Sequence, residues 1–384
     1  TIFLRKLSRK TWFFFEHFVG KEDNWLPPDN YQQNPVERIA HRTSPTNIGL
    51  SLLSNLTACD FGYITSGQMI ERCFYTFNTM QAMERYKGHF YNWYDTVSLA
   101  AMYPRYISTV DSGNLAGHLL TLKQGLLELS ARKITGARLF EGIRDTLYVA
   151  EEKIKQETAG NAAELSLLKP FKETLEQACA LRSETLVETR DILDRLSLLA
   201  ENIITENDLP ADTEASLWMD ALVKQCRSAE HELLIHAGWL KLKEAPPALE
   251  GLLSSLHAIP TLAMLAKLDE ALAPAIDSYA SRENTPSEKE WLNAFRLAIA
   301  RAAGEAREKI LIIERLARQC DEFSDMDYDF LLDRSQNLLA IGYNVEEHRR
   351  DLGFYDLLGS EARLGIFVAI AQGKISQQSW FALG

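Results

Sequence analysis

Residues 88–95 carry the densest set of side chains suited to sugar recognition. They read Gly-His-Phe-Tyr-Asn-Trp-Tyr-Asp, so aromatic rings alternate with polar groups. Aromatic faces stack on the apolar faces of pyranose rings, and amide and carboxylate groups hydrogen-bond the hydroxyls. The alternative is a loop whose aromatic rings fill the hydrophobic core. On the first interpretation, substrate contacts come from His89, Tyr91, Asn92, Trp93, Tyr94 and Asp95.

A second polar segment, residues 41–47, leads into the start of a predicted helix. Ser44 is a suitable N-cap residue, and Pro45 fits the first helical position. Backbone N–H groups point outward at such a terminus, which could also hold a phosphate, but no glycine-rich loop accompanies it. Capping explains Ser44. His41, Arg42 and Asn47 are candidate substrate contacts, with a purely structural role as the alternative.

Residues 108–114 hold a carboxylate and an amide. Asp111 could cap the helix predicted to follow it, or it could face a cleft together with Asn114, and both interpretations stay open on the sequence alone. Residues 25–30 read Trp-Leu-Pro-Pro-Asp-Asn and form a stiff loop. A structural role is favoured for this loop over a place in a cleft wall.

Glu361 is the candidate for direct participation in chemistry. It lies in the first turn of a predicted helix that is rich in small and apolar residues. Glycoside chemistry uses two carboxyl groups, and burial would raise the pKa of a glutamate toward the value that a general acid needs. The alternative is a first-turn acid that stabilises the helix dipole. Tyr355, Asp356 and Arg363 flank Glu361 and are candidate substrate contacts.

Helices are expected to position these segments at both ends of the chain. Apolar spacing predicts them over residues 44–60, 67–86, 113–131 and 360–373. Long polar and aromatic loops, residues 24–43 and 86–110, separate the first three. Residues 338–343 could form a short strand.

The middle of the chain, residues 132–320, is rich in Leu, Ala, Glu, Lys and Arg. This composition and its apolar periodicity predict long amphipathic helices with coiled-coil character. Their expected ranges are 137–158, 162–207, 212–241, 260–281 and 286–322. His231 and His236 lie five residues apart and not on one helix face, so we expect no metal site there.

No stretch shows sustained strand alternation, so the predicted fold class is all-α. Helices joined alternately by short and long loops suggest a helical toroid, in which the long loops gather at one end and build a cleft. The predicted organisation is a first part of a barrel (1–131), a helical insertion (132–320) and a continuation of the barrel (321–384).

Composition limits the class of protein and of partner. The 384 residues are 46% hydrophobic and 24% charged, with a formal charge of -12, as in an ordinary globular protein. No basic stripe indicates nucleic-acid binding, and no apolar run reaches the ~20 residues of a membrane helix. The five cysteines are scattered, which gives no support for zinc or a disulfide framework. The chain reads as a fragment cut from a longer protein at both ends.

Six motifs stand in a fixed order along the chain. They are Trp-Leu-Pro-Pro-Asp-Asn from Trp25, His-Arg-Thr-Ser-Pro-Thr-Asn-Ile-Gly from His41, Gly-His-Phe-Tyr-Asn-Trp-Tyr-Asp from Gly88, Thr-Val-Asp-Ser-Gly-Asn-Leu-Ala-Gly-His from Thr109, Ile-Gly-Tyr-Asn from Ile341 and Tyr-Asp-Leu-Leu-Gly-Ser-Glu-Ala-Arg from Tyr355. Together they resemble the glycoamylase-like middle region of cyclic β-1,2-glucan synthases. The helical middle of the chain matches that family only in position.

The resemblance implies an (α/α)6 barrel, incomplete in this chain, and a retaining mechanism with two glutamates. Glu361 would be one of them, as nucleophile or as acid/base, and the other would lie beyond Gly384. The chain alone would then be inactive. No cofactor and no metal are expected.

The enzymes of this family are large, membrane-anchored and built of several modules. A glycosyltransferase module extends a linear β-1,2-glucan, the middle module closes it into a ring by transglycosylation, and a phosphorylase-like module trims it. The resemblance therefore implies two partners, the β-1,2-glucan chain and the other modules of the same polypeptide. It places a soluble segment without a membrane span at the cytoplasmic face of the inner membrane. Nucleic acid is not an expected partner.

Two other functions fit the same residues. A stand-alone β-1,2-glucan hydrolase with this barrel would use water where the synthase uses a sugar hydroxyl. A non-enzymatic protein would use the long helices of residues 132–320 as a scaffold or docking arm.

Overall fold

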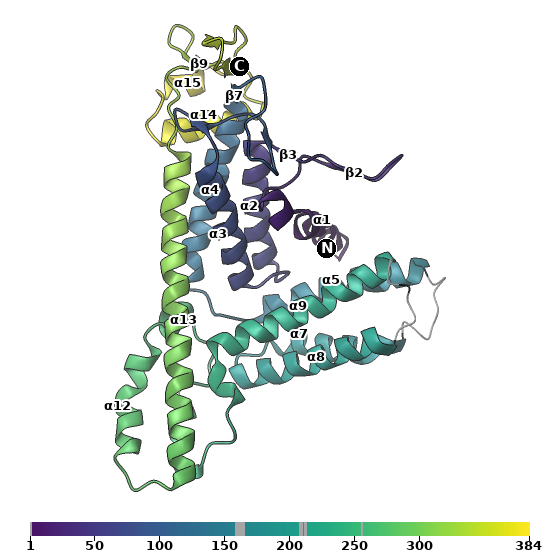
Figure 1. Ribbon diagram of the computed structural model, residues 1–384, viewed down its shortest axis with the longest axis vertical. Helices are drawn as coiled ribbons and strands as arrows, with labels where there is room; N and C mark the ends of the chain where they lie inside the picture. The colour runs from purple at the N-terminus through teal and green to yellow at the C-terminus, as the bar shows by residue number, and fades with distance from the viewer. Residues whose placement is uncertain (1, 158–165, 207–209, 211–212, 255) are drawn as a thin grey trace. The chain divides into compact units, whose positions relative to one another are not determined.

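The computed structural model describes residues 2–157, 166–206, 210, 213–254 and 256–384 (Figure 1). The chain folds into two compact units that alternate along the sequence. Unit 1 contains residues 1–11, 57–70 and 128–312, and unit 2 contains residues 12–56, 71–127 and 313–384. Most of the described residues are helical, and the largest sheet among them has three short strands. The predicted all-α class is therefore confirmed.

Several long helices contribute residues to both units: α1 (Ile2–Phe18), α2 (Pro45–Asp60), α3 (Ser66–Ala82), α4 (Thr109–Leu129) and α13 (Pro286–Ser324). Unit 1 also contains α5 (Ala137–Glu157), α7 (Lys169–Leu181), α8 (Leu186–Glu206), α9 (Glu214–His236), α10 (Glu250–Ser254), α11 (Leu262–Leu265) and α12 (Leu268–Ala280). Unit 2 also contains α14 (Ala362–Ala371) and α15 (Gln378–Phe381). No helix in the described part of the chain has the length and apolar surface that a membrane span requires.

In unit 1, helices α5, α7, α8 and α9 run side by side (Figure 1). Helix α5 contacts α7 and α9, and α8 contacts the same two helices. Each helix turns an apolar stripe inward, as its sequence period predicts. The stripes supply the buried side chains Phe140, Leu147, Phe171, Leu175, Leu193, Leu196, Trp218 and Leu222.

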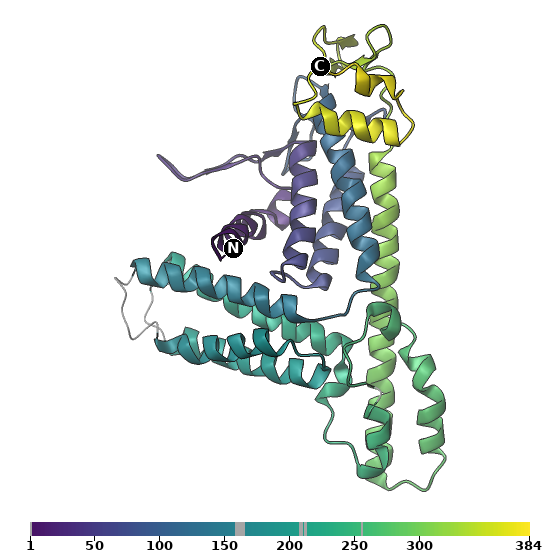
Figure 2. The same ribbon diagram turned by 180° about the vertical axis from the view of Figure 1, so that it is seen from behind.

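Ion pairs attach further elements of unit 1. Helix α12 lies along the N-terminal half of α13 (Figure 2), and Arg307 binds Asp269 there at 2.8 Å. A buried carboxylate, Glu232 of α9, accepts hydrogen bonds from Ser66 Oγ (2.6 Å) and Gly67 N (2.9 Å) at the start of α3. Burial opposes ionisation, but the nearby Lys309 ammonium and the Ser66 hydrogen bond hold the pKa of Glu232 below its ordinary value.

In unit 2, helices α2, α3 and α4 pack with the last part of α13. Their shared core contains Leu52, Phe77, Met80, Leu119 and Phe323. The Phe77 and Phe323 rings meet edge to face with centroids 5.5 Å apart. Polar contacts add to this core: Arg72 Nε donates to Asn55 Oδ1 (2.9 Å), and Lys123 binds Asp321 (2.7 Å).

The helices predicted at the two ends of the chain are confirmed, with shifted boundaries. Helix α4 begins before Asp111, and Ser108 Oγ accepts the Asp111 N–H (3.3 Å). Of the two interpretations left open for Asp111, the one in which it caps this helix is therefore wrong. Helix α3 ends at Ala82, and the chain turns into a strand instead of continuing to residue 86.

Two of the long helices predicted in the middle of the chain are interrupted. The single helix expected over 162–207 is wrong, because Arg182 in a left-handed conformation (φ 45) ends α7 and Thr185 caps α8. The range 260–281 contains α11, capped by Thr261, and then α12. The other three ranges are confirmed as α5, α9 with a short 3-10 turn, and α13. Residues 158, 162–165, 207 and 212 of these ranges lie outside the described residues.

The strands are two or three residues long and pair antiparallel in unit 2. They are β1 (Tyr31–Gln32), β2 (Arg38–Ile39), β3 (Arg42–Thr43), β4 (Arg85–Tyr86), β5 (His89–Phe90), β6 (Tyr94–Asp95), β7 (Tyr106–Ser108), β8 (Leu332–Asp333), β9 (Leu338–Leu339), β10 (Gly342–Asn344) and β11 (Arg349–Arg350). The extended segment predicted over 338–343 is thus confirmed as β9 and the start of β10.

All five cysteines are free thiols. Cys226 in unit 1 and Cys73 and Cys320 in unit 2 are fully buried. Burial raises the pKa of all three thiols, to about 12 for Cys73 and Cys226. Cys59 and Cys179 are partly exposed.

Candidate functional site

Short antiparallel pairs tie the long loops of unit 2 together at one end of its helices (Figure 2). Strand β3 pairs with β6, so that Arg42 stands opposite Asp95. Strand β7 pairs with β10, which places Ile107 opposite Tyr343 across more than two hundred residues of sequence. The same end carries the N-termini of α2 and α4. The polar segments singled out in the sequence are therefore neighbours in space.

Backbone N–H groups at the start of α2 donate hydrogen bonds to side chains from two different segments. Ser44 Oγ accepts from Asn47 N–H (3.2 Å), as the capping prediction requires. Asp111 Oδ1 accepts from Thr46 N–H (3.3 Å), and Asn114 Nδ2 donates to Thr46 Oγ1 (3.2 Å). Asp111 thus faces the N-terminus of α2 while it belongs to the first turn of α4.

The hydrogen-bond network extends from Asp111 to Asn92 and Trp93. In the amide orientation that its neighbours require, Asn92 donates to Asp111 Oδ2 (2.8 Å) and accepts from Trp93 Nε1 (3.1 Å). The Arg42 guanidinium lies over the Trp93 ring, 4.6 Å from its centroid. Arg42 also pairs with Asp29 at 2.9 Å, so its charge is neutralised within the site.

His41 and Asp95 make hydrogen bonds within the loop region. His41 Nδ1 lies 2.8 Å from the buried Asp23 Oδ1, and Thr96 Oγ1 donates to the same oxygen. Asp95 accepts from the Ser98 N–H (2.7 Å) and hydroxyl (2.8 Å). These bonds to Ser98, with a smaller contribution from Val97 N–H, lower the pKa of Asp95.

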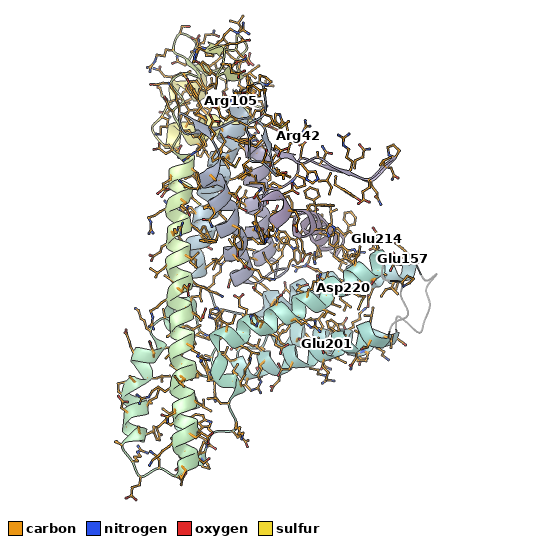
Figure 3. All side chains as sticks on the ribbon, in the orientation of Figure 1. Arg42, Arg105, Glu157, Glu201, Glu214 and Asp220 are labelled. Carbon is orange, nitrogen blue, oxygen red and sulfur yellow. The ribbon has the colours of Figure 1, made fainter. Side chains whose placement is uncertain are left out.

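His89, Tyr91 and Tyr94 point into the protein and not toward solvent. Both nitrogens of the fully buried His89 ring are occupied, by Ser112 Oγ (2.8 Å) and the Asp327 carbonyl (2.7 Å). The Tyr94 hydroxyl donates to the Glu84 carbonyl (2.5 Å). Arg105, labelled at this end of unit 2 in Figure 3, covers the Tyr91 ring. For these three residues the burial supports the alternative of aromatic side chains that fill the core beneath the loop.

Glu361 occupies the residue before α14 and is exposed. The prediction of a place inside the first turn is therefore wrong by one position, because α14 begins at Ala362. The Glu361 side chain makes no capping hydrogen bond, and within the described residues it forms no ion pair. Its carboxylate is thus free to interact with a ligand. Asp356 and Arg363 are also exposed, and Tyr355 is half-buried beside them.

The sequence did not reveal Tyr106, Asp351 and Asp29 as parts of this region. The Tyr106 hydroxyl donates to Asp351 Oδ2 (2.6 Å), and the Tyr106 ring takes up the space that a side chain at Gly342 would need. Asp29 also accepts from Asn47 Nδ2 (3.4 Å). The Asp in the Pro-Pro-Asp loop was the only available signal for Asp29. No local pattern marks a pairing between residues as distant as 106 and 351.

Two concave regions lie elsewhere. A cavity of about 370 Å³ in unit 1 is lined by Ile64, Ser66, Arg132, Thr135 and Glu232 among others. A groove of about 480 Å³ in unit 2 lies between Lys87, Asp327 and Lys374. Among the described residues, no cluster of His, Cys, Asp or Glu is arranged to hold a metal ion.

The chain was compared with known proteins. No protein-family model matches it. Over 385 aligned residues, which include 99% of this chain, it is 31% identical to the cyclic β-(1,2)-glucan synthase NdvB of Rhizobium meliloti (strain 1021). The resemblance inferred from the motifs is confirmed. The chain spans only 12% of the length of that synthase.

Solved structures with partial similarity are glucoamylase-like proteins. One from Bacteroides fragilis aligns with 33% of this chain and 32% of its own at a TM-score of 0.30. Another from Bacteroides caccae aligns with 40% of this chain and 39% of its own at a TM-score of 0.28. Both are 16% identical in sequence to the chain over the aligned parts.

Proposed function

We propose that this chain is the part of a glycosyl-transfer domain that binds a β-1,2-glucan and presents one of two catalytic carboxylates, Glu361. The observation that carries the proposal is that Glu361, exposed and unpaired within the described residues, shares unit 2 with a polar and aromatic loop cluster. Similarity along 99% of the chain to a cyclic glucan synthase supports the substrate class. The relative is much longer, so the domain would work beside other modules of one membrane-anchored polypeptide.

The proposed reaction is retaining transglycosylation. One carboxylate attacks the anomeric carbon while the other protonates the departing glycosidic oxygen, which gives a glycosyl-enzyme intermediate. The second group then removes a proton from a hydroxyl at the far end of the same glucan, and that oxygen displaces the enzyme carboxylate and closes the ring. Water in place of the sugar hydroxyl would give hydrolysis from the same residues.

Replacement of Glu361 by Gln in the complete protein that carries this chain tests the proposal. We expect cyclisation of linear β-1,2-glucan to fall by at least ~10²–10⁴-fold, the contribution of acid–base assistance, while linear chain growth continues. If Glu361 only stabilised the dipole of α14, the change would cost ~0.3–1 kcal/mol of stability and leave ring formation intact. Glu347→Gln is the matched control, because Glu347 is exposed and pairs only with Arg349 among the described residues.

Azide rescue of Glu361→Ala would assign the role of this residue. If Glu361 is the nucleophile, azide attacks the substrate directly and gives the inverted glycosyl azide. If Glu361 is the acid/base, azide attacks the glycosyl-enzyme and gives the retained one.

Product analysis of the unmodified protein separates a synthase, which makes rings, from a hydrolase, which makes short linear chains.

A further inference from the structure

Helices α4 and α14 cross at a pair of glycines. A Cβ added to Gly113 would overlap Gly365 Cα, and one added to Gly365 would lie 3.0 Å from Gly113 Cα. The two backbones are therefore in direct contact at this point. Asp111 precedes Gly113 by two residues and Glu361 precedes Gly365 by four, so each lies within about one helical turn, ~5.4 Å, of the crossing.

Asp111 has hydrogen-bonding capacity left over. A carboxylate offers about four acceptor positions, and the structure uses one on each oxygen, for Thr46 N–H and for Asn92 Nδ2. The residue is only half-buried, so the remaining positions are open to a ligand. These two donors come from α2 and from the 88–95 loop and fix the direction of the carboxylate.

Tyr355 lies near both carboxylates. Burial, followed by the negative charges of Asp111 and Glu361, raises the pKa of the Tyr355 hydroxyl, because both carboxylates lie close to it. Within the described residues this hydroxyl has no hydrogen-bond partner. Asp111 and Tyr355, both half-buried, and the exposed Glu361 therefore lie near one another beside the α4–α14 crossing.

We infer that Asp111 holds one glucosyl unit of the substrate beside Glu361 by accepting hydrogen bonds from two of its hydroxyls. The inference rests on the proposed function and adds a positioning residue to it. In a β-1,2-linked glucan the 2-hydroxyl is consumed by the linkage, so the hydroxyls at positions 3, 4 and 6 remain to donate. A carboxylate accepts from two neighbouring hydroxyls at once, and Tyr355 adds a hydroxyl that either donates or accepts.

The structural alternative is that Asp111 only caps α2 through Thr46. The two roles respond differently to Asp111→Asn. Asparagine keeps an oxygen for the Thr46 N–H and loses the acceptor for Asn92 Nδ2, so the cap of α2 is preserved. It loses the charge and replaces one acceptor oxygen by a donor, so a charge-assisted bond to the sugar is lost.

The test measures linear β-1,2-glucan binding to the complete protein in a Glu361→Gln background, where turnover does not interfere. Adding Asp111→Asn should weaken binding by about 10–100-fold, which corresponds to losing a hydrogen bond to a charged group. In the presence of Glu361 the same change should lower kcat/KM for ring formation by a similar factor. Asp321→Asn is the matched control, because Asp321 pairs with Lys123 on an exposed face.

Unchanged glucan affinity in the Asp111→Asn protein would overturn the inference and leave the cap of α2 as the role of this residue. If the Glu361→Gln protein does not bind linear β-1,2-glucan and the unmodified protein does not convert it, the proposed function fails. The inference that rests on it then fails as well. Should Asp111→Asn melt well below the unmodified protein, Asp111→Glu replaces it. This variant keeps the charge but moves it by one methylene, and the same loss of affinity is expected.

Discussion

His89 shows how burial changes the role of a residue that composition marks as a ligand contact. Its ring lies between Tyr328 and Phe330, with centroids 5.1 and 5.3 Å away. Ser112 Oγ and the Asp327 carbonyl occupy both nitrogens. Burial lowers the pKa of His89 to about 4, and the nearby Lys87 acts in the same direction, against the opposing effect of Asp327. The ring is therefore neutral at physiological pH.

This lowered pKa predicts a loss of stability in mild acid. The unfolded chain binds a proton at His89 near pH 6.5 and the folded chain only near 4, so the stabilisation is complete above about pH 6.5 and is lost as the pH falls toward 4. Between pH 7 and 5 the free energy of unfolding should fall by about 2 kcal/mol more in the unmodified protein than in His89→Gln. Urea titrations of both proteins at the two pH values measure the difference. If the free energies of unfolding of the two proteins change equally with pH, His89 has the same pKa in the folded and the unfolded chain, and the prediction is wrong.

At the scale of elements, the Gly113–Gly365 crossing sets how closely α4 and α14 approach. Gly113→Ala should lower the free energy of unfolding of unit 2 by about 1–3 kcal/mol, because the added methyl forces the two backbones apart. Gly304→Ala on α13 is the matched control, since a Cβ there meets no atom within 4 Å.

The control should show the opposite sign. Alanine is favoured over glycine within a helix, so Gly304→Ala should stabilise the protein by about 0.5–1 kcal/mol. Urea midpoints of the two variants give the comparison. A Gly113→Ala protein as stable as Gly304→Ala would mean that the crossing relaxes freely.

Helices could be predicted from the sequence where local signals agree. Ser44 with Pro45 marked α2, and a clean apolar period marked α4. The break between α7 and α8 escaped prediction, because Arg182 adopts its left-handed conformation without a glycine or proline to signal it.

The strands that tie the loops of unit 2 together were largely unpredictable for a different reason. A two-residue strand has no period of its own, and its partner is far away in sequence, as for Ile107 and Tyr343. For the candidate site, the sequence therefore identified the correct segments. It could not tell that Asn92 and Trp93 join the Asp111 network while His89, Tyr91 and Tyr94 turn inward.

At the scale of the whole molecule, the formal charge of -12 bears on what the chain binds. A glucan is uncharged, so its binding should change by less than about twofold between ~50 and ~200 mM salt. A polyanion bound through lysines and arginines would instead lose about 10³–10⁵ in affinity over that range. Titrations of linear β-1,2-glucan at both salt concentrations test this, and a steep salt dependence would contradict a neutral ligand.

The buried cysteines allow the local opening of each unit to be measured separately. A thiol with a pKa of about 12 reacts with a disulfide reagent only when its surroundings open, so the labelling rate measures local opening. Peptide mapping would then read unit 1 from Cys226 and unit 2 from Cys73 and Cys320. A glucan that binds in unit 2 should slow the modification of Cys73 and Cys320 and leave the rate at Cys226 as it was.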